Sequence, residues 1–243
     1  MQAVLNSSEQ IVRYDRSHTK EWLFGLLIVE IITVLTPVGV LSSSFRFPDI
    51  LREPAAAALP LFSANQSIIV PAYYVFMLSG LLYLPISVLI RKQFTGTATR
   101  SLLDLLVGLG IATALFQAIG FCRWLFAVPY LAKTYEQAAG NAPLRASVAL
   151  LYDTLNRYAG MTIGEHLGFV AMGSWTICLA LVLSKTGAPQ WLRGGGILIG
   201  ALIILSVAEH FGTAWSGFFG LVNFIANALW TVWLLVLAVR IIR

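Results

Sequence analysis

Six long apolar segments divide this sequence and constrain its fold more than any other feature. They cover residues 22–42, 70–90, 102–131, 166–184, 195–211 and 217–242. A helix needs about 20 mostly apolar residues to cross the hydrocarbon core of a bilayer, and these segments reach or approach that length. We therefore predict an all-α polytopic membrane protein, a bundle of about six transmembrane helices whose main partner is the lipid bilayer.

The composition excludes several other classes of protein. Charged residues make up 11% of the 243 residues and apolar residues 58%, whereas about a quarter of the residues in a soluble domain are charged. The net charge of +5 does not indicate nucleic-acid binding, because the basic residues lie in short connections between apolar segments. Nucleotide-binding loops, nucleophile elbows and zincin motifs are absent, so the sequence assigns no enzyme class.

The distribution of Lys and Arg predicts the orientation of the chain. Ten of the 16 lie in the two termini and the even-numbered connections, and five lie in the odd-numbered connections. Cytoplasmic connections are enriched in these residues, so we expect a multi-pass protein of the cell membrane with both termini in the cytoplasm. Residues 1–21 then form a cytoplasmic N-terminal segment, and residues 22–243 form a single six-helix domain.

Two longer connections, residues 43–69 and 132–165, are predicted to lie outside. Pro48, Pro54 and Pro60 should prevent a long helix in the first, which favours a loop on the surface. In the second, residues 146–158 have apolar side chains at helical spacing, which indicates a short amphipathic helix at the outer interface, over the mouth of the bundle. An ordinary connector is the alternative.

Ionisable residues inside the apolar segments are candidate functional residues, because each costs about 2.5–3.5 kcal/mol to insert. Glu30 lies in the middle of the first segment and Arg123 in the outer part of the third. A guanidinium stays charged in lipid, so we predict a carboxylate partner for Arg123. The candidate partners are Glu165, Glu209 and Glu30.

Two Glu-His pairs occur in similar local sequences, GEHLG at 164–168 and AEHFG at 208–212. The short connection between the fourth and fifth segments favours antiparallel neighbours, which brings both pairs to one depth near the outer surface. We therefore predict that His166 and His210 belong to one site, with a neighbouring glutamate fixing an imidazole tautomer.

The sixth segment has a polar stripe, with Asn223 and Asn227 four residues apart and Trp230 next along the same face. Gln117, Gly120 and Arg123 form a comparable stripe in the third segment. One interpretation is a polar chamber that opens outward. The alternative is hydrogen bonding that only joins helices.

Several of these segments resemble a known family. The stretch GFCRWLFAVPY at 120–130, GEHLG at 164–168 and the glycine-rich fifth segment are similar to small bacterial integral membrane proteins that share a domain of unknown function. The resemblance implies a location in the bacterial inner membrane. It implies no activity.

Two functional hypotheses remain open. In the first, the protein binds or transports a small or amphipathic, lipid-like solute from the outer side, with Arg123 attracting an anionic group and Glu30 deeper in the path. In the second, it is a membrane oxidoreductase or metalloprotein in which His166 and His210 bind haem or a transition metal. Glu165, Glu209, Asn223 and Asn227 complete the candidate binding residues.

Overall fold

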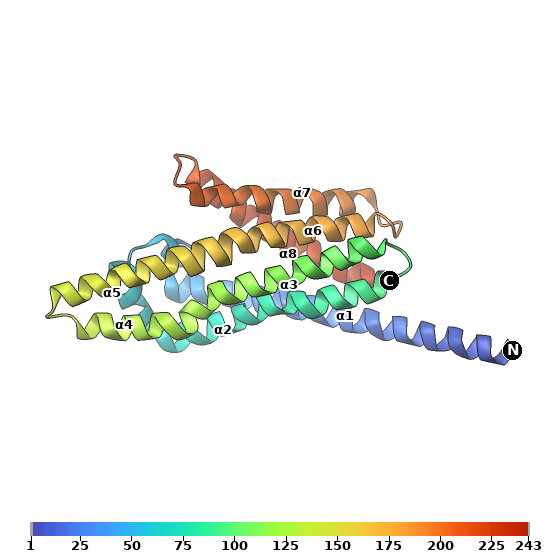
Figure 1. Cartoon of the computed structure of the whole chain (residues 1–243), viewed down its shortest axis with the longest axis horizontal. Helices are drawn as coiled ribbons and strands as arrows, with labels where there is room; N and C mark the ends of the chain where they lie inside the picture. Colours follow the sequence, from blue (N-terminus) through green and yellow to red (C-terminus); the bar gives the residue numbers. More distant parts are fainter. Residues whose placement is uncertain (1, 243) are drawn as a thin grey trace.

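The computed structural model describes the backbone of residues 2–242 and the side chains of residues 18–241, and its described part confirms the all-α prediction. Six helical stretches among these residues are long and apolar enough to cross a membrane. The elements, shown in Figure 1, are α1 (Gln2–Phe45), η1 (Asp49–Arg52), α2 (Ala55–Phe94), α3 (Arg100–Cys122), η2 (Arg123–Ala127), α4 (Val128–Gln137), α5 (Ala142–Leu155), η3 (Asn156–Leu167), α6 (Gly168–Leu183), α7 (Gln190–Ser206), η4 (Val207–Phe211) and α8 (Ser216–Ile242).

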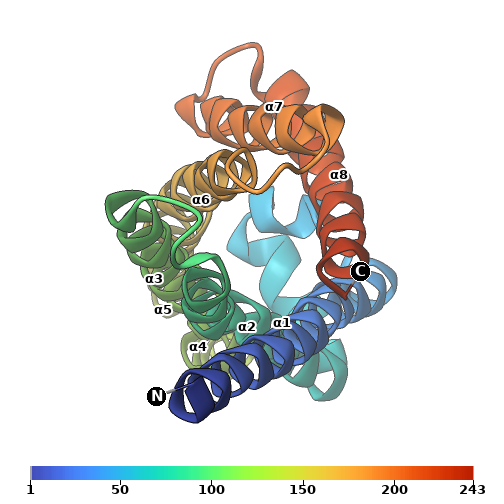
Figure 2. The same cartoon turned by 90° about the vertical axis from the view of Figure 1, so that its right-hand side faces the viewer.

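The six spanning helices pack as a closed ring. Each contacts two neighbours, in the order α1, α2, α3, α6, α7, α8 and back to α1. Figure 2 looks along this ring from the end where both termini lie. The light-blue chain between α1 and α2 is visible through the ring at its opposite end, which we call the distal end. The α1–α2 connection therefore lies across the distal mouth of the ring.

Three of the helical stretches are much longer than a membrane requires. Residues 55–94, 100–137 and 142–183 form stretches of 40, 38 and 42 residues. At about 1.5 Å per residue each is close to 60 Å long, about twice the thickness of a hydrocarbon core. The beginning of α2, all of α4 and all of α5 therefore extend past the spanning part at the distal end, where α4 and α5 form the hairpin at the left of Figure 1.

The prediction of a long loop over 43–69 was wrong. α1 continues to Phe45 and α2 begins at Ala55, so the connection is short. Pro54 precedes the first turn of α2, a position where proline suits a helix start, and Pro60 lies inside α2. The helix continues past Pro60 because Ala58, Leu59 and Phe62 are fully buried and hold it in place. Its one irregular residue is Asn65, with φ −125° and ψ 18°.

The helix predicted over 146–158 is present as part of α5 and η3, but the prediction that it is a separate interfacial helix in an outer loop over 132–165 was wrong. α5, η3 and α6 form one continuous helical path from Ala142 to Leu183, and α5 lies in line with α6 in Figure 1. Of the predicted stripe, Val148 and Tyr152 are buried, but Leu151 and Tyr158 are exposed. The stripe therefore marks packing of a hairpin. Residues 2–21 of the predicted N-terminal segment belong to α1 itself.

Two separate groups of buried apolar side chains stabilise the chain. One lies in the spanning ring and includes Leu27, Tyr83, Trp175 and Trp230. The other joins the end of α1, the beginning of α2, η2, α4 and α5, and contains Phe45, Phe62, Tyr73, Trp124 and Tyr152. This distal core was not predicted, because 11 of its 17 buried residues lie in the segments predicted to be loops.

Glycines allow close helix contacts in the ring. A Cβ added at Gly200 of α7 would lie 2.5 Å from the carbonyl oxygen of Gly173 in α6, and one added at Gly196 would lie 2.9 Å from the side chain of Ala180. Small residues four positions apart allow such a close approach of two helices. A second such crossing joins Gly120 of α3 to Gly164 of η3.

Candidate functional site

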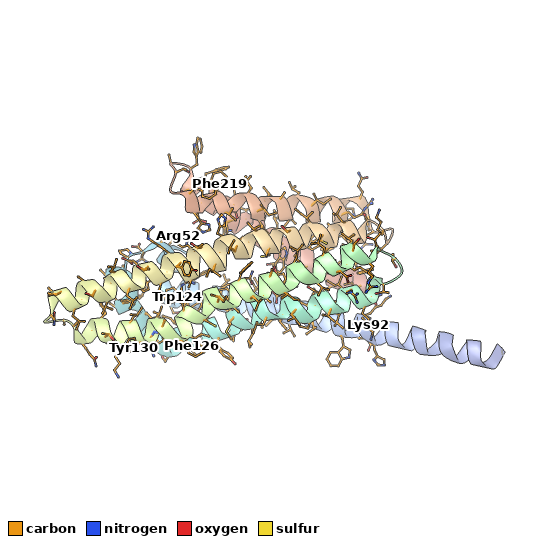
Figure 3. The ribbon with its side chains drawn as sticks, viewed as in Figure 1. Arg52, Lys92, Trp124, Phe126, Tyr130 and Phe219 are labelled. Carbon is orange, nitrogen blue, oxygen red and sulfur yellow. The ribbon has the colours of Figure 1, made fainter. Side chains whose placement is uncertain are left out.

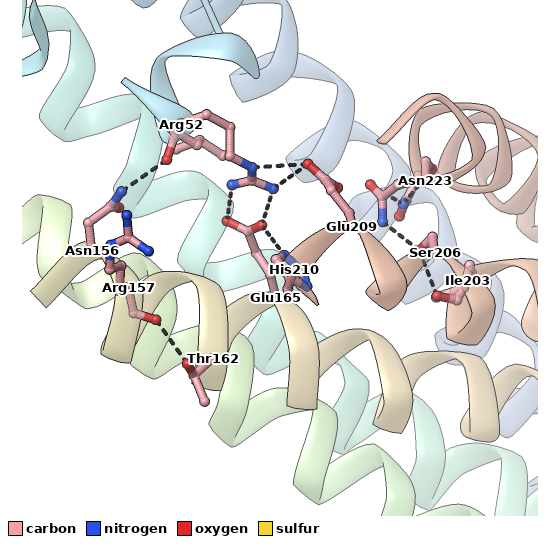
Figure 4. A network of polar contacts seen from close by, with 12 residues as sticks. Arg52, Asn156, Arg157, Thr162, Glu165, Ile203, Ser206, Glu209, His210 and Asn223 are labelled. Atoms are coloured by element: carbon pink, nitrogen blue, oxygen red, sulfur yellow. Dashed lines mark hydrogen bonds and ion pairs between the residues drawn. The ribbon is translucent and has the colours of Figure 1, made fainter. Parts of the chain in front are cut away.

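Arg52 joins three segments at the distal mouth of the ring (Figure 4). Its guanidinium donates to both oxygens of Glu165 in η3, with Nη1–Oε1 at 3.2 Å and Nη2–Oε2 at 2.6 Å. It also donates to Oε1 of Glu209 in η4, from Nε at 2.9 Å and Nη2 at 2.8 Å. Such two-point guanidinium–carboxylate contacts fix geometry as well as charge.

The surroundings of Arg52 explain its charge state. Burial alone would lower the pKa of the guanidinium, but attraction to Glu165 and Glu209 and the hydrogen bonds with them outweigh burial, so the pKa lies above its ordinary value. The carboxylate side chains keep only 14% and 17% of their surface exposed, against 34% for Arg52. One permanent cation therefore separates two half-buried anions.

The connection that carries Arg52 is held from the opposite side by α5 and η3. Asn156 donates from Nδ2 to the carbonyl oxygen of Leu51 at 2.9 Å. The backbone N–H of Ala55 donates to Oδ1 of Asp153 at 3.3 Å. These two contacts, on either side of Arg52 in the chain, set the direction from which its side chain reaches the mouth.

The two histidines lie together, as the sequence predicts. The ring centroids of His166 and His210 are 5.9 Å apart, with an angle of 63° between the planes. Nε2 of His210 lies 3.0 Å from Oε2 of Glu165, so Glu165 is placed to fix the tautomer of His210. The Nδ1 atom of His210 is buried and has no hydrogen-bond partner among the described residues.

This geometry does not favour a metal centre built from several protein side chains. The part of the chain whose side chains are described contains no group of three or more His, Cys, Asp or Glu side chains arranged to hold a metal ion. Glu165 and Glu209 direct their oxygens at Arg52 instead, and His210 is engaged by Glu165. The residues present do not fit a metal centre in this arrangement.

Arg123 differs from the prediction of a carboxylate partner. It begins η2, is 7% exposed, and donates from Nη1 to the carbonyl oxygen of Gly120. No ion pair joins it to a carboxylate among the described side chains, because Arg52 has both distal glutamates. Its guanidinium lies 5.1 Å from the centroid of the Trp124 ring and directly against Gly160, where an added Cβ would collide with it.

Glu30 lies inside the ring, apart from the distal cluster. It is 2% exposed, and its Oε2 has no hydrogen-bond partner among the described residues. The gap beside it is too narrow to admit a water molecule and is bounded by aromatic and aliphatic side chains: Leu27, Tyr83, Ile86, Trp175, Trp230 and Leu234. The hydroxyl of Tyr83 also lacks a described partner.

Two side chains of the polar stripe of α8, Asn223 and Trp230, join neighbouring helices, whereas Asn227 bonds within α8. Asn223 donates from Nδ2 to the hydroxyl of Ser206 in α7 at 2.9 Å. Asn227 donates to the carbonyl oxygen of Asn223, and the indole of Trp230 donates to the hydroxyl of Thr176 at 3.0 Å. A larger hollow, about 450 Å³ between α2 and α4, contains none of the predicted site residues.

Two features of the site were missed from the sequence. Arg52 counted only toward topology, although an arginine in the connection before the second segment can reach carboxylates at the same depth. The second is wide helical winding: Arg123 begins the π-helix η2, and Glu165 and His166 lie in the π-helix η3. Such winding is rare in proteins, and where it occurs it is often at a functional site. No residue pattern in the sequence indicates it.

Comparison with known proteins agrees with the resemblance. A model for DUF4386, a domain of unknown function, matches residues 24–238. The chain belongs to this family. The matched part of the DUF4386 domain includes Arg52, Arg123, both Glu-His pairs and Glu30. Neither the curated proteins nor the solved structures contain a match to the chain.

Proposed function

We propose that this DUF4386 protein binds or transports a small or amphipathic solute that enters the ring from its distal, outward-facing end. One observation carries the proposal: Arg52 closes the distal mouth through ion pairs with Glu165 and Glu209, above a ring interior that contains the buried carboxylate Glu30. Buried ionisable groups in a membrane protein are expensive and mark ligand or ion paths by default.

The ion pairs supply a mouth that can open. Arg52 lies on a short connection, whereas Glu165 and Glu209 belong to helical elements on the opposite side of the ring. A solute that competes for the carboxylates, or for the guanidinium, would release this connection. Access to Glu30 would then follow from movement of η1, with the ring helices unchanged.

The direction of entry rests on orientation, for which we retain the prediction from Lys and Arg. Arg91 and Arg100 pair with Asp104 at the terminus end of the ring, where Lys92 also lies (Figure 3), as expected of a cytoplasmic face. The structure does not describe the side chains of Arg13 and Arg16 or any part of Arg243. A reporter fused after Arg243 should be active only in a cytoplasmic form, and periplasmic activity would reverse the direction of entry.

Labelling of cysteines tests the path itself. In a variant without Cys122 and Cys178, a hydrophilic, membrane-impermeant thiol reagent added from outside should label Glu30→Cys slowly. The additional change Arg52→Ala should increase this labelling rate at least about tenfold, because it removes the contacts that close the mouth. Mass spectrometry of the intact protein measures the labelled fraction over time.

The adjacent residue provides the matched control. Val29 is 44% exposed on the lipid-facing side of α1, so Val29→Cys should stay unlabelled by the hydrophilic reagent with or without Arg52. A contrary result would be a Glu30→Cys variant that a permeant reagent labels but the hydrophilic reagent does not, with or without Arg52→Ala. That result would rule out a path from the distal end.

A further inference from the structure

A second group of polar side chains lies within the distal core. Each member is at least 93% buried and has a hydrogen-bonding atom with no partner among the described residues. The group, here called the Arg123 cluster, consists of Tyr73, Arg123, Trp124 and Tyr152. Buried polar atoms in folded proteins are nearly always satisfied, so several unsatisfied atoms in one place require a specific explanation.

Trp124 connects the members of the cluster. Its ring stacks on Tyr73 at 5.0 Å and meets Tyr152 edge-on at 6.4 Å between centroids. The Arg123 guanidinium lies 5.1 Å from the centroid of the same ring. In Figure 3, Trp124 lies within the bundle, whereas Phe126 and Tyr130 point outward. The three elements α2, η2 and α5 thus bring these groups together.

The unused atoms are mostly hydrogen-bond donors. Nε of Arg123 and Nε1 of Trp124 can only donate, and the phenol hydroxyls of Tyr73 and Tyr152 can donate as well as accept. The guanidinium also contributes a permanent positive charge. Glu165, one of its predicted partners, is bonded to Arg52 and His210 instead. Arg123 has the Gly120 carbonyl and the Trp124 ring as partners but no carboxylate of its own, and a buried charge that lacks a counter-charge is unfavourable, so the cluster is complementary to an anionic acceptor.

We infer that the Arg123 cluster binds an oxyanion, a carboxylate or a phosphate group, with Arg123, Trp124 and the two phenols as donors. The inference deepens the proposed function and rests on it, because it names the chemical class of the solute that enters distally. Gly160 is required in this arrangement, since any side chain there would displace the guanidinium. The oxyanion can come from a small soluble ion or from the headgroup of an amphiphile.

The experiment uses the whole protein in a nonionic detergent. Thermal unfolding is followed with increasing acetate, inorganic phosphate or decanoate, and with decanol as the uncharged match for decanoate. We expect at least one oxyanion to raise Tm saturably by about 3 °C or more, because a ligand that binds only the folded state stabilises it. A response to decanoate alone identifies an amphiphile, and a response to acetate or phosphate identifies a free ion.

Three variants test the assignment to residues. Arg123→Gln and Gly160→Ala should each weaken oxyanion binding at least about tenfold. Arg145→Gln should leave it unchanged, because Arg145 is exposed and lies 4.3 Å from the Tyr135 ring, away from the cluster. Should Arg123→Gln fail to fold, Tyr73→Phe and Tyr152→Phe remove only an unpartnered hydroxyl. Each should weaken binding about threefold or more without lowering Tm in the absence of oxyanion.

Several outcomes would overturn the oxyanion site: a Tm shift with decanol equal to that with decanoate, an unchanged affinity in the phenylalanine variants, or no shift with any oxyanion. If Glu30→Cys is still labelled from outside in that case, the path through the ring stands and only the site fails. If labelling fails while oxyanion binding depends on Arg123, the site stands and the path fails.

Discussion

Replacement of Arg52 with alanine is expected to destabilise the folded protein by about 3 kcal/mol, near the lower end for loss of one partner of a buried ion pair. The reason lies in what remains. Glu165 and Glu209 keep 14% and 17% of their side-chain surface exposed and both contact the same Nη2 atom of Arg52. Without the guanidinium, two carboxylates would face each other with little solvent between them. The partial exposure of Arg52 itself argues against a larger effect.

Arg46 offers a matched control in the same connection. Its ion pair with Glu53 is long, at 3.4 Å, and both side chains are substantially exposed, so Arg46→Ala should cost less than about 1 kcal/mol. Unfolding in detergent against denaturant measures both variants. The triple variant Arg52→Met, Glu165→Gln, Glu209→Gln should recover part of the stability that Arg52→Ala loses. Equal losses in the two alanine variants would contradict a distal mouth closed by charge.

The spanning part of the fold could be predicted because hydrocarbon imposes a simple requirement. A run of apolar residues of sufficient length must form a helix there, since backbone polar groups find no other partners. The same logic failed for 43–69 and 132–165. Outside the membrane, proline and polar residues are compatible with helices when an apolar core holds them, and Phe62 and Tyr152 belong to such a core. Apolar residues at helical spacing over 146–158 indicated that one face of a helix is buried, but they did not indicate the direction in which that helix runs.

The sequence predicted the two Glu-His pairs of the candidate site and the proximity of its histidines, but not the arginine that binds its glutamates. Equal depth of the two Glu-His pairs followed from antiparallel neighbours, and His166 and His210 do lie side by side. The prediction that Arg123 pairs with one of the glutamates was wrong, because Arg52 pairs with both. Arg123 and Arg52 have comparable depth, and sequence spacing does not show which of the two reaches the carboxylates. The choice depends on η1, which Asn156 and Asp153 anchor. Contacts between segments about 100 residues apart leave no local signal.

Close packing of α6 on α7 predicts the second large effect, in Gly200→Ala. The new Cβ would meet the carbonyl oxygen of Gly173 at 2.5 Å, Cγ1 of Ile177 at 2.7 Å and the backbone nitrogen of Ile177 at 3.2 Å. Two of these atoms belong to the α6 backbone, so rotation of a side chain cannot relieve the collision. The helices must separate, which should cost about 1–3 kcal/mol as overpacking does in other cores.

Gly108→Ala is the control for this change, because a Cβ at Gly108 in α3 meets nothing within 4 Å. Alanine there should leave stability unchanged or raise it by up to about 1 kcal/mol, since alanine favours the helix over glycine. The comparison separates the intrinsic preference for helix, which both substitutions share, from the collision, which only Gly200→Ala introduces. Denaturant midpoints in one detergent measure the difference. A Gly200→Ala variant as stable as Gly108→Ala would mean that α6 and α7 do not approach as closely as the ring requires.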